Sequence, residues 1–431
     1  MRRTLFVLFM LCLVLFTILP TVSAQGDEVV GPDEYPDGVN PLTGLLVDDP
    51  AVLDRRPLIA KVVNAPAEAR PQWGVAQADI VWEYLLAGGY TRFAAVFYSE
   101  SPERVGPIRS LRLVDFELVR MYKSLLVTSG MAVGTYDVLR QDGLMLSRTI
   151  SGDSPCPPLC RDEELDRKYE LTLFVDTEGL RELAEEMGKD VEPESINGLA
   201  FSSAVPDGGK AIDDIQVRYA AADIVWAYDP ARNVWLRSQD GEPHTDAVSG
   251  EQLEADNVII LEDEHTIQPF VSEEYWGYSN FAFSVNLIGS GRAVLLRDGQ
   301  YFDGQWQRSS RDEHLRFYDN EGNLLPFKPG RSFFMLVPRW VDGYQLAFDV
   351  PEPATATVNV SSANFRWGPS QYASRSGFGY EGDAFAAIGR NNSGTWIELL
   401  IDNEPMWVLG ELVTLDVPVM TLPAARSTNE Y

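Results

Sequence analysis

Two dense clusters of polar and charged residues between residues 64 and 112 suit the binding of an anion. They are Asn64 with Ala69-Arg70-Pro71-Gln72, then Tyr84, Gly88-Gly89, Thr91-Arg92 and Gly106-Pro107-Ile108-Arg109-Ser110-Leu111-Arg112. From Arg55 to Lys123 the chain has ten Lys and Arg against seven Asp and Glu, although its overall formal charge is -29. Guanidinium groups offer planar paired donors for carboxylate or phosphate. We therefore predict an anion-binding site that consists of Asn64, Arg70, Gln72, Arg92, Arg109, Ser110 and Arg112.

The start of a helix is expected to shape this site. Ser110 to Tyr122 has helical spacing, so Ser110 would cap that helix and leave its first backbone N-H groups free for an anion. Arg109 and Arg112, three residues apart, would flank the ligand from one side. Arg70 and Arg92 would complete the ring. The deciding observation is whether the guanidinium groups of Arg56, Arg70, Arg92, Arg109 and Arg112 face one open cleft. The alternative is an internal salt-bridge network that uses the same side chains.

A catalytic interpretation would have to rest on carboxylates. Glu83 with Asp79 or Asp115 could form an acid and base pair, because such pairs follow no fixed sequence spacing. The sequence contains no Ser nucleophile motif, and its three His residues show no ligand spacing. We therefore expect a binding or scaffolding protein without metal or cofactor. A carboxylate-dependent envelope hydrolase is the alternative, and a structural adaptor for another exported protein is a third hypothesis.

The N-terminus predicts export. Two Arg residues precede an apolar run, and Val22-Ser23-Ala24 forms a small-residue cleavage site, so residues 1–24 are expected to be a signal peptide. The apolar run is shorter than the roughly 20 residues that a membrane-spanning helix needs, which disfavours a retained anchor. An oxidising compartment would allow Cys156 and Cys160 to form a disulfide. The acidic balance disfavours nucleic acid as a partner.

Segments rich in turn-forming residues divide the chain and predict several domains. Residues 25–39 are expected to be a linker, 40–199 an α/β domain, 200–340 a mainly-β domain, 341–356 a second linker, 357–417 a small β-barrel and 418–431 a tail. In the first domain, four short apolar runs predict strands at 58–63, 80–84, 93–97 and 124–128. A second helix is expected from Thr177 to Met187, with Thr177 as its cap.

The C-terminal unit resembles the bacterial SH3 domain family. The motifs that carry the resemblance are Asn364-Phe365-Arg366-Trp367-Gly368-Pro369-Ser370, Gly382-Asp383, Trp396-Ile397-Glu398-Leu399 and Trp407-Val408. Trp367 stands where the family usually has a small residue. The resemblance implies a small barrel that binds cell-wall peptides or packs against a neighbouring domain.

Residues 40 to about 339 resemble the YerB-like lipoprotein family, a bacterial family of unknown function with an N-terminal and a C-terminal domain. The resemblance is carried by Asn40-Pro41-Leu42-Thr43-Gly44-Leu45, Ala69-Arg70-Pro71-Gln72, Ala78-Asp79-Ile80-Val81, Thr91-Arg92-Phe93, Gly106-Pro107-Ile108-Arg109-Ser110, Asp256-Asn257-Val258-Ile259 and Pro329-Gly330. Ala87 and Thr128 replace an acidic residue and a His of the family pattern. Together these features predict an exported, envelope-associated protein whose partner is a cell-wall peptide, an anionic envelope polymer or another exported protein.

Overall fold

The structure is a computed structural model that describes residues 29–422, with gaps at 87–88, 153–155, 220, 264, 276–277, 339–345, 348–353, 392, 402–403 and 420–421. The expected signal peptide, the first four residues of the first linker, most of the second linker and most of the tail lie outside the described residues. Ala87 and Gly88 also lie outside them.

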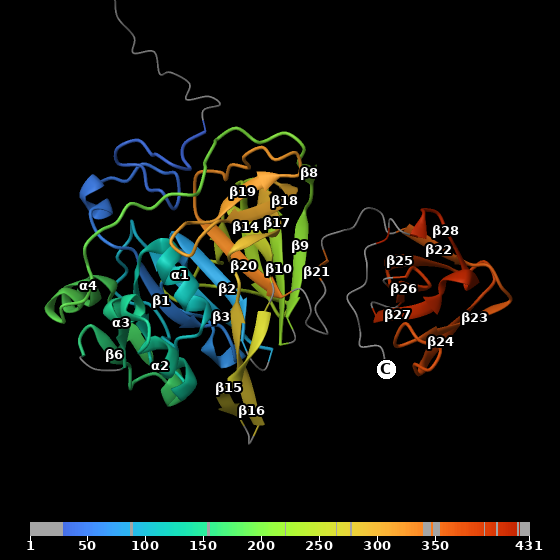
Figure 1. Cartoon of the computed structure of the whole chain (residues 1–431), viewed down its shortest axis with the longest axis horizontal. Helices are drawn as coiled ribbons and strands as arrows, with labels where there is room; N and C mark the ends of the chain where they lie inside the picture. Colours follow the sequence, from blue (N-terminus) through green and yellow to red (C-terminus); the bar gives the residue numbers. More distant parts are fainter. Residues whose placement is uncertain are drawn as a thin grey trace, which may run out of the picture.

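The main body is organised around one long mixed sheet (Figure 1). Its strands follow the order β19 (Arg316–Asp319), β18 (Gln300–Arg308), β17 (Gly289–Arg297), β14 (Asn257–Asp263), β20 (Ser332–Pro338), β2 (Ile80–Leu85), β3 (Thr91–Phe97), β1 (Leu58–Val63), β4 (Leu125–Thr128) and β5 (Thr149–Ser151), with β8 (Lys210–Ala211) paired to β18. The four strands predicted in the first domain are confirmed as β1 to β4.

Strands from both sides of the expected boundary at residue 199 share this sheet. β20 lies between β14 and β2 and pairs in parallel with both. Side chains from both segments also share the two large buried apolar clusters of the main body. Residues 40–199 and 200–340 therefore share one sheet and do not form two separate cores.

A second sheet covers one face of the main sheet. It comprises β12 (Glu242–Pro243), β11 (Val234–Gln239), β10 (Ala222–Asp229), β9 (Asp214–Tyr219) and β21 (Leu346–Ala347), with β13 (Glu254–Ala255) paired to β11. β9, β10 and β11 alternate buried and more exposed residues, as expected for strands with one face against a core. Their apolar side chains, including Trp226 and Trp235, pack with those of Leu58, Val81 and Phe93 from the main sheet.

Helices cover the opposite face. They are α1 (Val114–Tyr122), α2 (Val133–Leu139) and α3 (Gly143–Arg148). The fourth helix, α4 (Thr177–Glu186), packs instead on the side of the main sheet that the second sheet covers. Short 3-10 turns are η1 (Pro50–Leu53), η2 (Ala67–Ala69), η3 (Val75–Gln77), η4 (Tyr169–Leu171) and η5 (Gly410–Leu412). α1 begins four residues after Ser110, and Leu113 occupies its N-cap without a side-chain hydrogen bond. The predicted capping role of Ser110 is therefore wrong. Similarly, Asp176 rather than Thr177 caps α4, because its carboxylate accepts from the Glu178 backbone N-H.

Two further strand pairs complete the main body. β15 (His265–Tyr275) pairs with β16 (Tyr278–Val285), and this hairpin contacts α1 and α2. β6 (Leu159–Arg161) pairs with β7 (Leu173–Val175). The expected disulfide between Cys156 and Cys160 is present at the start of β6.

The C-terminal residues form a sheet and a core of their own. The antiparallel strands are β24 (Arg375–Tyr380), β23 (Ser362–Arg366), β27 (Glu404–Leu409), β26 (Trp396–Ile401), β25 (Ala384–Arg390), β22 (Ala354–Val358) and β28 (Val413–Leu415). Phe365, Ile397, Leu399 and Val408 are among the side chains of its small apolar core. We call these strands the C-terminal module. Within the described part of the chain, no helix has the length and apolar character needed to cross a bilayer.

Candidate functional site

Alternation along the strands divides the predicted site between the two faces of the main sheet. Side chains of neighbouring strand residues point to opposite faces. Glu83 and Thr91 therefore face the second sheet, whereas Tyr84 and Arg92 face α1, which agrees with the apolar residues that flank them on each face. Residues that are adjacent in the sequence thus belong to two different buried polar clusters.

The first cluster, which we call the Glu83 network, consists of the buried residues Asn64, Gln72, Glu83, Thr91, Arg237 and His244. Glu83 forms an ion pair with Arg237 Nη2 at 2.8 Å, and both side chains have 0% exposure. Asn64 Nδ2 donates to Glu83 Oε1 at 2.9 Å and to Thr91 Oγ1 at 2.7 Å. Thr91 Oγ1 in turn donates to Glu83 Oε1. A buried carboxylate with this many partners has a structural role in joining the two sheets.

Gln72 and His244 close the other end of the network. Gln72 Nε2 donates to the Val63 carbonyl at 2.8 Å, and its side-chain oxygen lies 2.7 Å from His244 Nε2. Burial, followed by the positive charge of Arg237, holds the pKa of His244 well below its ordinary value, so the imidazole is neutral. The structure thus places Asn64 and Gln72, two of the predicted ligand residues, inside a hydrogen-bonded core.

The second cluster, which we call the Lys61 cluster, consists of Lys61, Tyr84, Arg92, Arg112 and Asp115. Lys61 has 0% exposure, and its Nζ lies 2.8 Å from Asp115 Oδ1. The Tyr84 hydroxyl contacts Lys61 Nζ and donates to the same carboxylate oxygen at 2.8 Å. Asp115 Oδ2 accepts the Arg112 backbone N-H at 2.7 Å, which fixes the first turn of α1 against β1 and β2.

Two arginines lie near the Lys61 amine. Burial lowers the pKa of Lys61 from 10.5 to about 8, Asp115 opposes this shift, and the nearby charges of Arg92 and Arg112 reinforce it. Both guanidinium side chains are themselves largely buried, at 2% and 7% exposure. Lys61, Arg92 and Arg112 are thus gathered at one buried place beneath α1.

A pocket opens beside this cluster. It encloses about 300 Å³, including the open solvent at its mouth, and is lined by Tyr84, Leu85, Leu86, Arg112, Val114, His265, Phe283 and Val285. Tyr84 and Arg112 therefore connect the pocket to the buried Lys61–Asp115 pair, and the β15–β16 hairpin forms its other wall. Burial lowers the pKa of His265 to about 4, so this imidazole is neutral at physiological pH.

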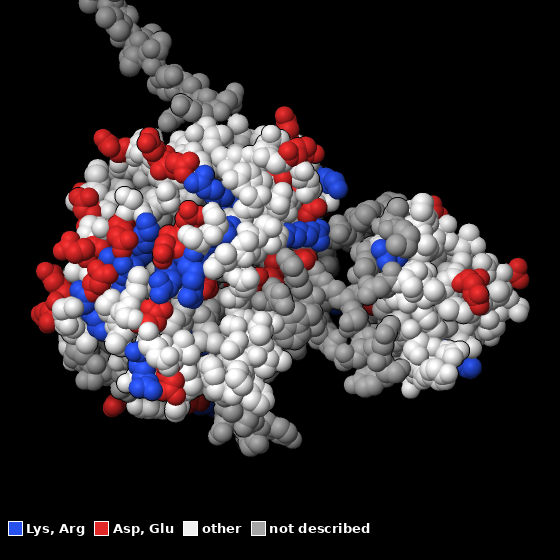
Figure 2. Space-filling view, viewed as in Figure 1, with Lys and Arg blue, Asp and Glu red and all other residues white. Residues whose placement is uncertain are grey.

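The other predicted cations lie elsewhere. Arg70 pairs with Asp240 at 2.7 Å. Arg56 binds Asp190 and Glu194, each at 2.8 Å. Figure 2 shows the same mixture of basic and acidic side chains over this face of the main body. The five Arg residues therefore do not share one cleft, because Arg56 and Arg70 are held by their own carboxylates.

Arg109 and Ser110 lie in the segment that precedes α1. The Arg109 backbone N-H donates to the Lys61 carbonyl at 2.8 Å, and its Nη1 lies 3.3 Å from the Glu170 carbonyl oxygen. Ser110 is half-buried in a segment without regular structure. Their assignment as ligand residues stays a prediction.

Asp79, the second candidate acid or base, is also fully engaged. Its carboxylate accepts hydrogen bonds from Asn40 Nδ2 at 2.8 Å, from the Tyr98 backbone N-H at 2.6 Å and from the backbone and side chain of Ser99. These contacts fix the entry to β2. Glu83 and Asp79 thus both have structural partners.

Comparison with known proteins identifies the family to which the main body belongs. Residues 42–190 match the model described as the N-terminal domain of a protein of unknown function, DUF3048, and residues 215–334 match its C-terminal domain. The chain belongs to the DUF3048 family. The two matched segments are the ones that share the long sheet, so the family unit is the whole main body, and the C-terminal module follows it.

A sequence relative and a solved structure support this assignment. The chain is 28% identical over 340 residues to the "Putative lipoprotein YerB" of Bacillus subtilis (strain 168), which covers 76% of this chain and 94% of that protein. The crystal structure of the Bacillus subtilis YerB protein is similar, with a TM-score of 0.58 at 26% identity over 69% of this chain and 96% of that chain. The relationship to a lipoprotein is consistent with an extracytoplasmic, envelope-associated location for this DUF3048 protein.

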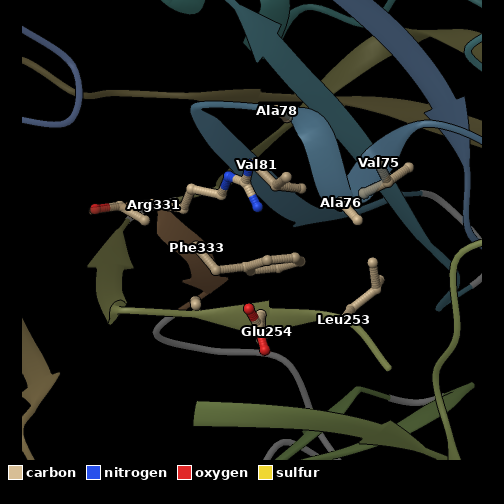
Figure 3. Close-up of a pocket in the computed structure, with 10 residues that line it drawn as sticks. Val75, Ala76, Ala78, Val81, Leu253, Glu254, Arg331 and Phe333 are labelled. Carbon is tan, nitrogen blue, oxygen red and sulfur yellow. The ribbon is translucent and has the colours of Figure 1, made fainter. Parts of the chain in front are cut away.

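A second pocket in this DUF3048 protein has a mostly apolar lining (Figure 3). It encloses about 280 Å³, including open solvent, and is lined by Val75, Ala76, Ala78, Val81, Leu253, Glu254, Ala255, Arg331, Ser332 and Phe333. Most of these side chains are apolar, and the Glu254 carboxylate binds Arg232. Within the described residues, no group of three or more His, Cys, Asp or Glu side chains is arranged to hold a metal ion.

Sequence reasoning missed Lys61, the central residue of the candidate site. The available signal was its position, because Leu58-Ile-Ala-Lys-Val-Val63 is otherwise wholly apolar and all six residues are buried. A lysine in a strand that is covered on both faces requires a buried partner. That partner, Asp115, comes from a helix 54 positions later, and only the fold brings the two together.

Proposed function

We propose that this chain is an exported envelope protein that binds an anionic group in the pocket beside the Lys61 cluster. The ligand group would be a wall-peptide carboxylate or the phosphate of an envelope polymer. The C-terminal module, interpreted as SH3-like from its sequence motifs, would add a second attachment to the wall and so increase avidity.

One observation carries this proposal: Tyr84 and Arg112 line a pocket that lies directly against a buried Lys61–Asp115 pair. Burying an ion pair contributes little to stability by itself, because desolvation offsets the attraction between the charges. The perturbed Lys61 amine, close to a pocket that Arg112 lines, supports a binding role. Arg109, just before α1, would extend the cationic surface toward solvent.

A binding role is favoured over the hydrolase alternative for a geometric reason. A catalytic carboxylate must reach the substrate. Glu83, Asp79 and Asp115 are instead buried at 0%, 2% and 0% exposure, and none of them lines the pocket of the Lys61 cluster.

The test is anion binding by Arg112→Gln. We expect this substitution to weaken binding of inorganic phosphate or of a wall-peptide carboxylate by roughly 10- to 100-fold, since a charge-assisted hydrogen bond contributes about 1.5–3 kcal/mol. Isothermal titration calorimetry on the full-length mature chain measures the effect. Arg112→Lys, which keeps the charge but not the planar donor pair, should lose less.

The matched control is Arg55→Gln. Arg55 pairs with Glu178 at 3.0 Å, away from the pocket, so its removal should leave affinity within about twofold. Thermal melting of each variant separates lost binding from lost folding. Equal affinity of wild type and Arg112→Gln, at equal melting temperature, would refute the proposed pocket.

A further inference from the structure

The C-terminal module gathers exposed aromatic side chains on one hairpin. Among the described residues, eight aromatic side chains are more than a third exposed, and four of them lie between residues 367 and 380. They are Trp367 at 49%, Tyr372 at 84%, Phe378 at 55% and Tyr380 at 57% exposure. Two come from the loop after β23 and two from β24. Such a concentration of exposed apolar surface marks an interaction site.

The geometry of the hairpin shows that these rings are not displaced core residues. Phe378 and Tyr380 are two positions apart on β24, so they project from the same face, and their ring centroids lie 5.3 Å apart in an edge-to-face arrangement. The intervening Gly379 and the paired strand's Phe365 face the core instead and are buried. β24 ends the strand order of the module, so this pair lies at the edge of its sheet.

Charge around the rings differs from that of the whole protein. Residues 354–383 have two Arg residues against Glu381 and Asp383, a neutral balance in a chain with a formal charge of -29. The Asp383 carboxylate accepts the Tyr380 backbone N-H at 2.8 Å. Arg366 Nη1 donates to the Ala373 carbonyl within the loop, whereas Arg375 is exposed at the start of β24. In Figure 2 the visible face of the module is mostly uncharged, in contrast with the main body. The hairpin should therefore repel an anionic partner less than the rest of the chain does.

We propose that this aromatic hairpin binds a carbohydrate chain that bears carboxylate groups. Flat aromatic rings present apolar faces onto which the C-H faces of sugar rings stack, and the exposed guanidinium of Arg375 would pair with a carboxylate. The hydroxyl and amide groups of Asn364, Ser370 and Gln371 lie within the same hairpin segment and suit sugar hydroxyls. The inference deepens the proposed function and rests on it, because it names the glycan strand rather than the peptide as the wall component that the module contacts.

The experiment uses the full-length mature chain and wall glycan strands from which peptides have been removed enzymatically. Wild type is expected to cosediment with these strands, and Phe378→Ala combined with Tyr380→Ala should weaken binding about tenfold or more. The matched control is Tyr136→Ala on α2, another exposed aromatic ring at 53% exposure, which should bind like wild type. An excess of free wall peptides should not compete.

A second variant tests the charge without removing a ring. Arg375→Gln should weaken binding to carboxylated strands and leave binding to a neutral N-acetylglucosamine oligomer unchanged. Two results would overturn the glycan inference while leaving the envelope-binding function in place. One is that wild type binds intact wall but not peptide-free strands, and the other is that free peptides displace it. Absence of binding to intact wall would refute the module's role in the proposed function as well, whereas the phosphate titrations test the Lys61 pocket independently.

Discussion

Replacing Glu83 with glutamine is expected to lower the free energy of unfolding by about 3–5 kcal/mol, the range measured when one member of a buried ion pair is removed. The reason is that Arg237, with 0% exposure, would keep its charge without a carboxylate to compensate it. The Asn64 and Thr91 hydrogen bonds to Glu83 Oε1 would also be disturbed. Urea denaturation followed by fluorescence of the intact chain measures the change.

A double-mutant cycle with Arg237→Met tests the cause. The combined variant should be less destabilised than the sum of the two single variants, because it no longer leaves a buried charge alone. The matched control is Glu178→Gln, which removes a surface partner of Arg55 that is 55% exposed and should cost less than about 1 kcal/mol. Similar losses for Glu83→Gln and Glu178→Gln would contradict the structural role of the Glu83 network.

Stability is also expected to rise with pH above 8 because of Lys61. Its folded-state pKa is about 8 against an ordinary value of 10.5. Below pH 8 the amine is protonated in both states, so the cost of burying the cation is fully present. Between the two values the unfolded chain keeps a proton that the folded chain has released, and folding becomes more favourable. Over pH 8 to 9.5 the gain is about 2 kcal/mol.

Comparison with Lys61→Met isolates this contribution. The variant cannot titrate at this position, so its stability should lack the rise that wild type shows between pH 8 and 9.5. The range ends before the tyrosines oppose the effect: burial raises the pKa of Tyr98 to about 12, so unfolding releases its proton at high pH. Lys61→Gln serves if the Met variant does not fold. If the free energy of unfolding rises equally with pH in wild type and in the variants, Lys61 is not the titrating group.

The fold of the main body was largely predictable at the level of single elements. Apolar runs with β-branched or aromatic residues correctly predicted β1 to β4. The sharing of one sheet by the two halves was not predictable from local pattern. The pairing of β20 with β2 joins segments about 250 residues apart, and no spacing rule encodes that neighbour.

The start of α1 shows why the helix cap was predicted wrongly. Ser110 has the residue type of a cap, and the following residues have helical spacing. The segment before α1 is instead held to β1 and β4 by backbone hydrogen bonds from Arg109 to Lys61 and from Ser129 to Arg109. Tertiary pairing therefore delays the helix to Val114.

The sequence by itself determined that Arg, Asn, Gln and acidic residues cluster between residues 64 and 112, and that a structural network and a ligand site were both possible uses for them. The tertiary structure decided that these residues divide between opposite faces of one sheet. Asn64, Gln72 and Glu83 join the second sheet, whereas Arg92 and Arg112 join Lys61 beneath α1. The physical reason is the two-residue period of a β-strand, which sends neighbours such as Glu83 and Tyr84 to different environments, and only packing determines what each environment contains.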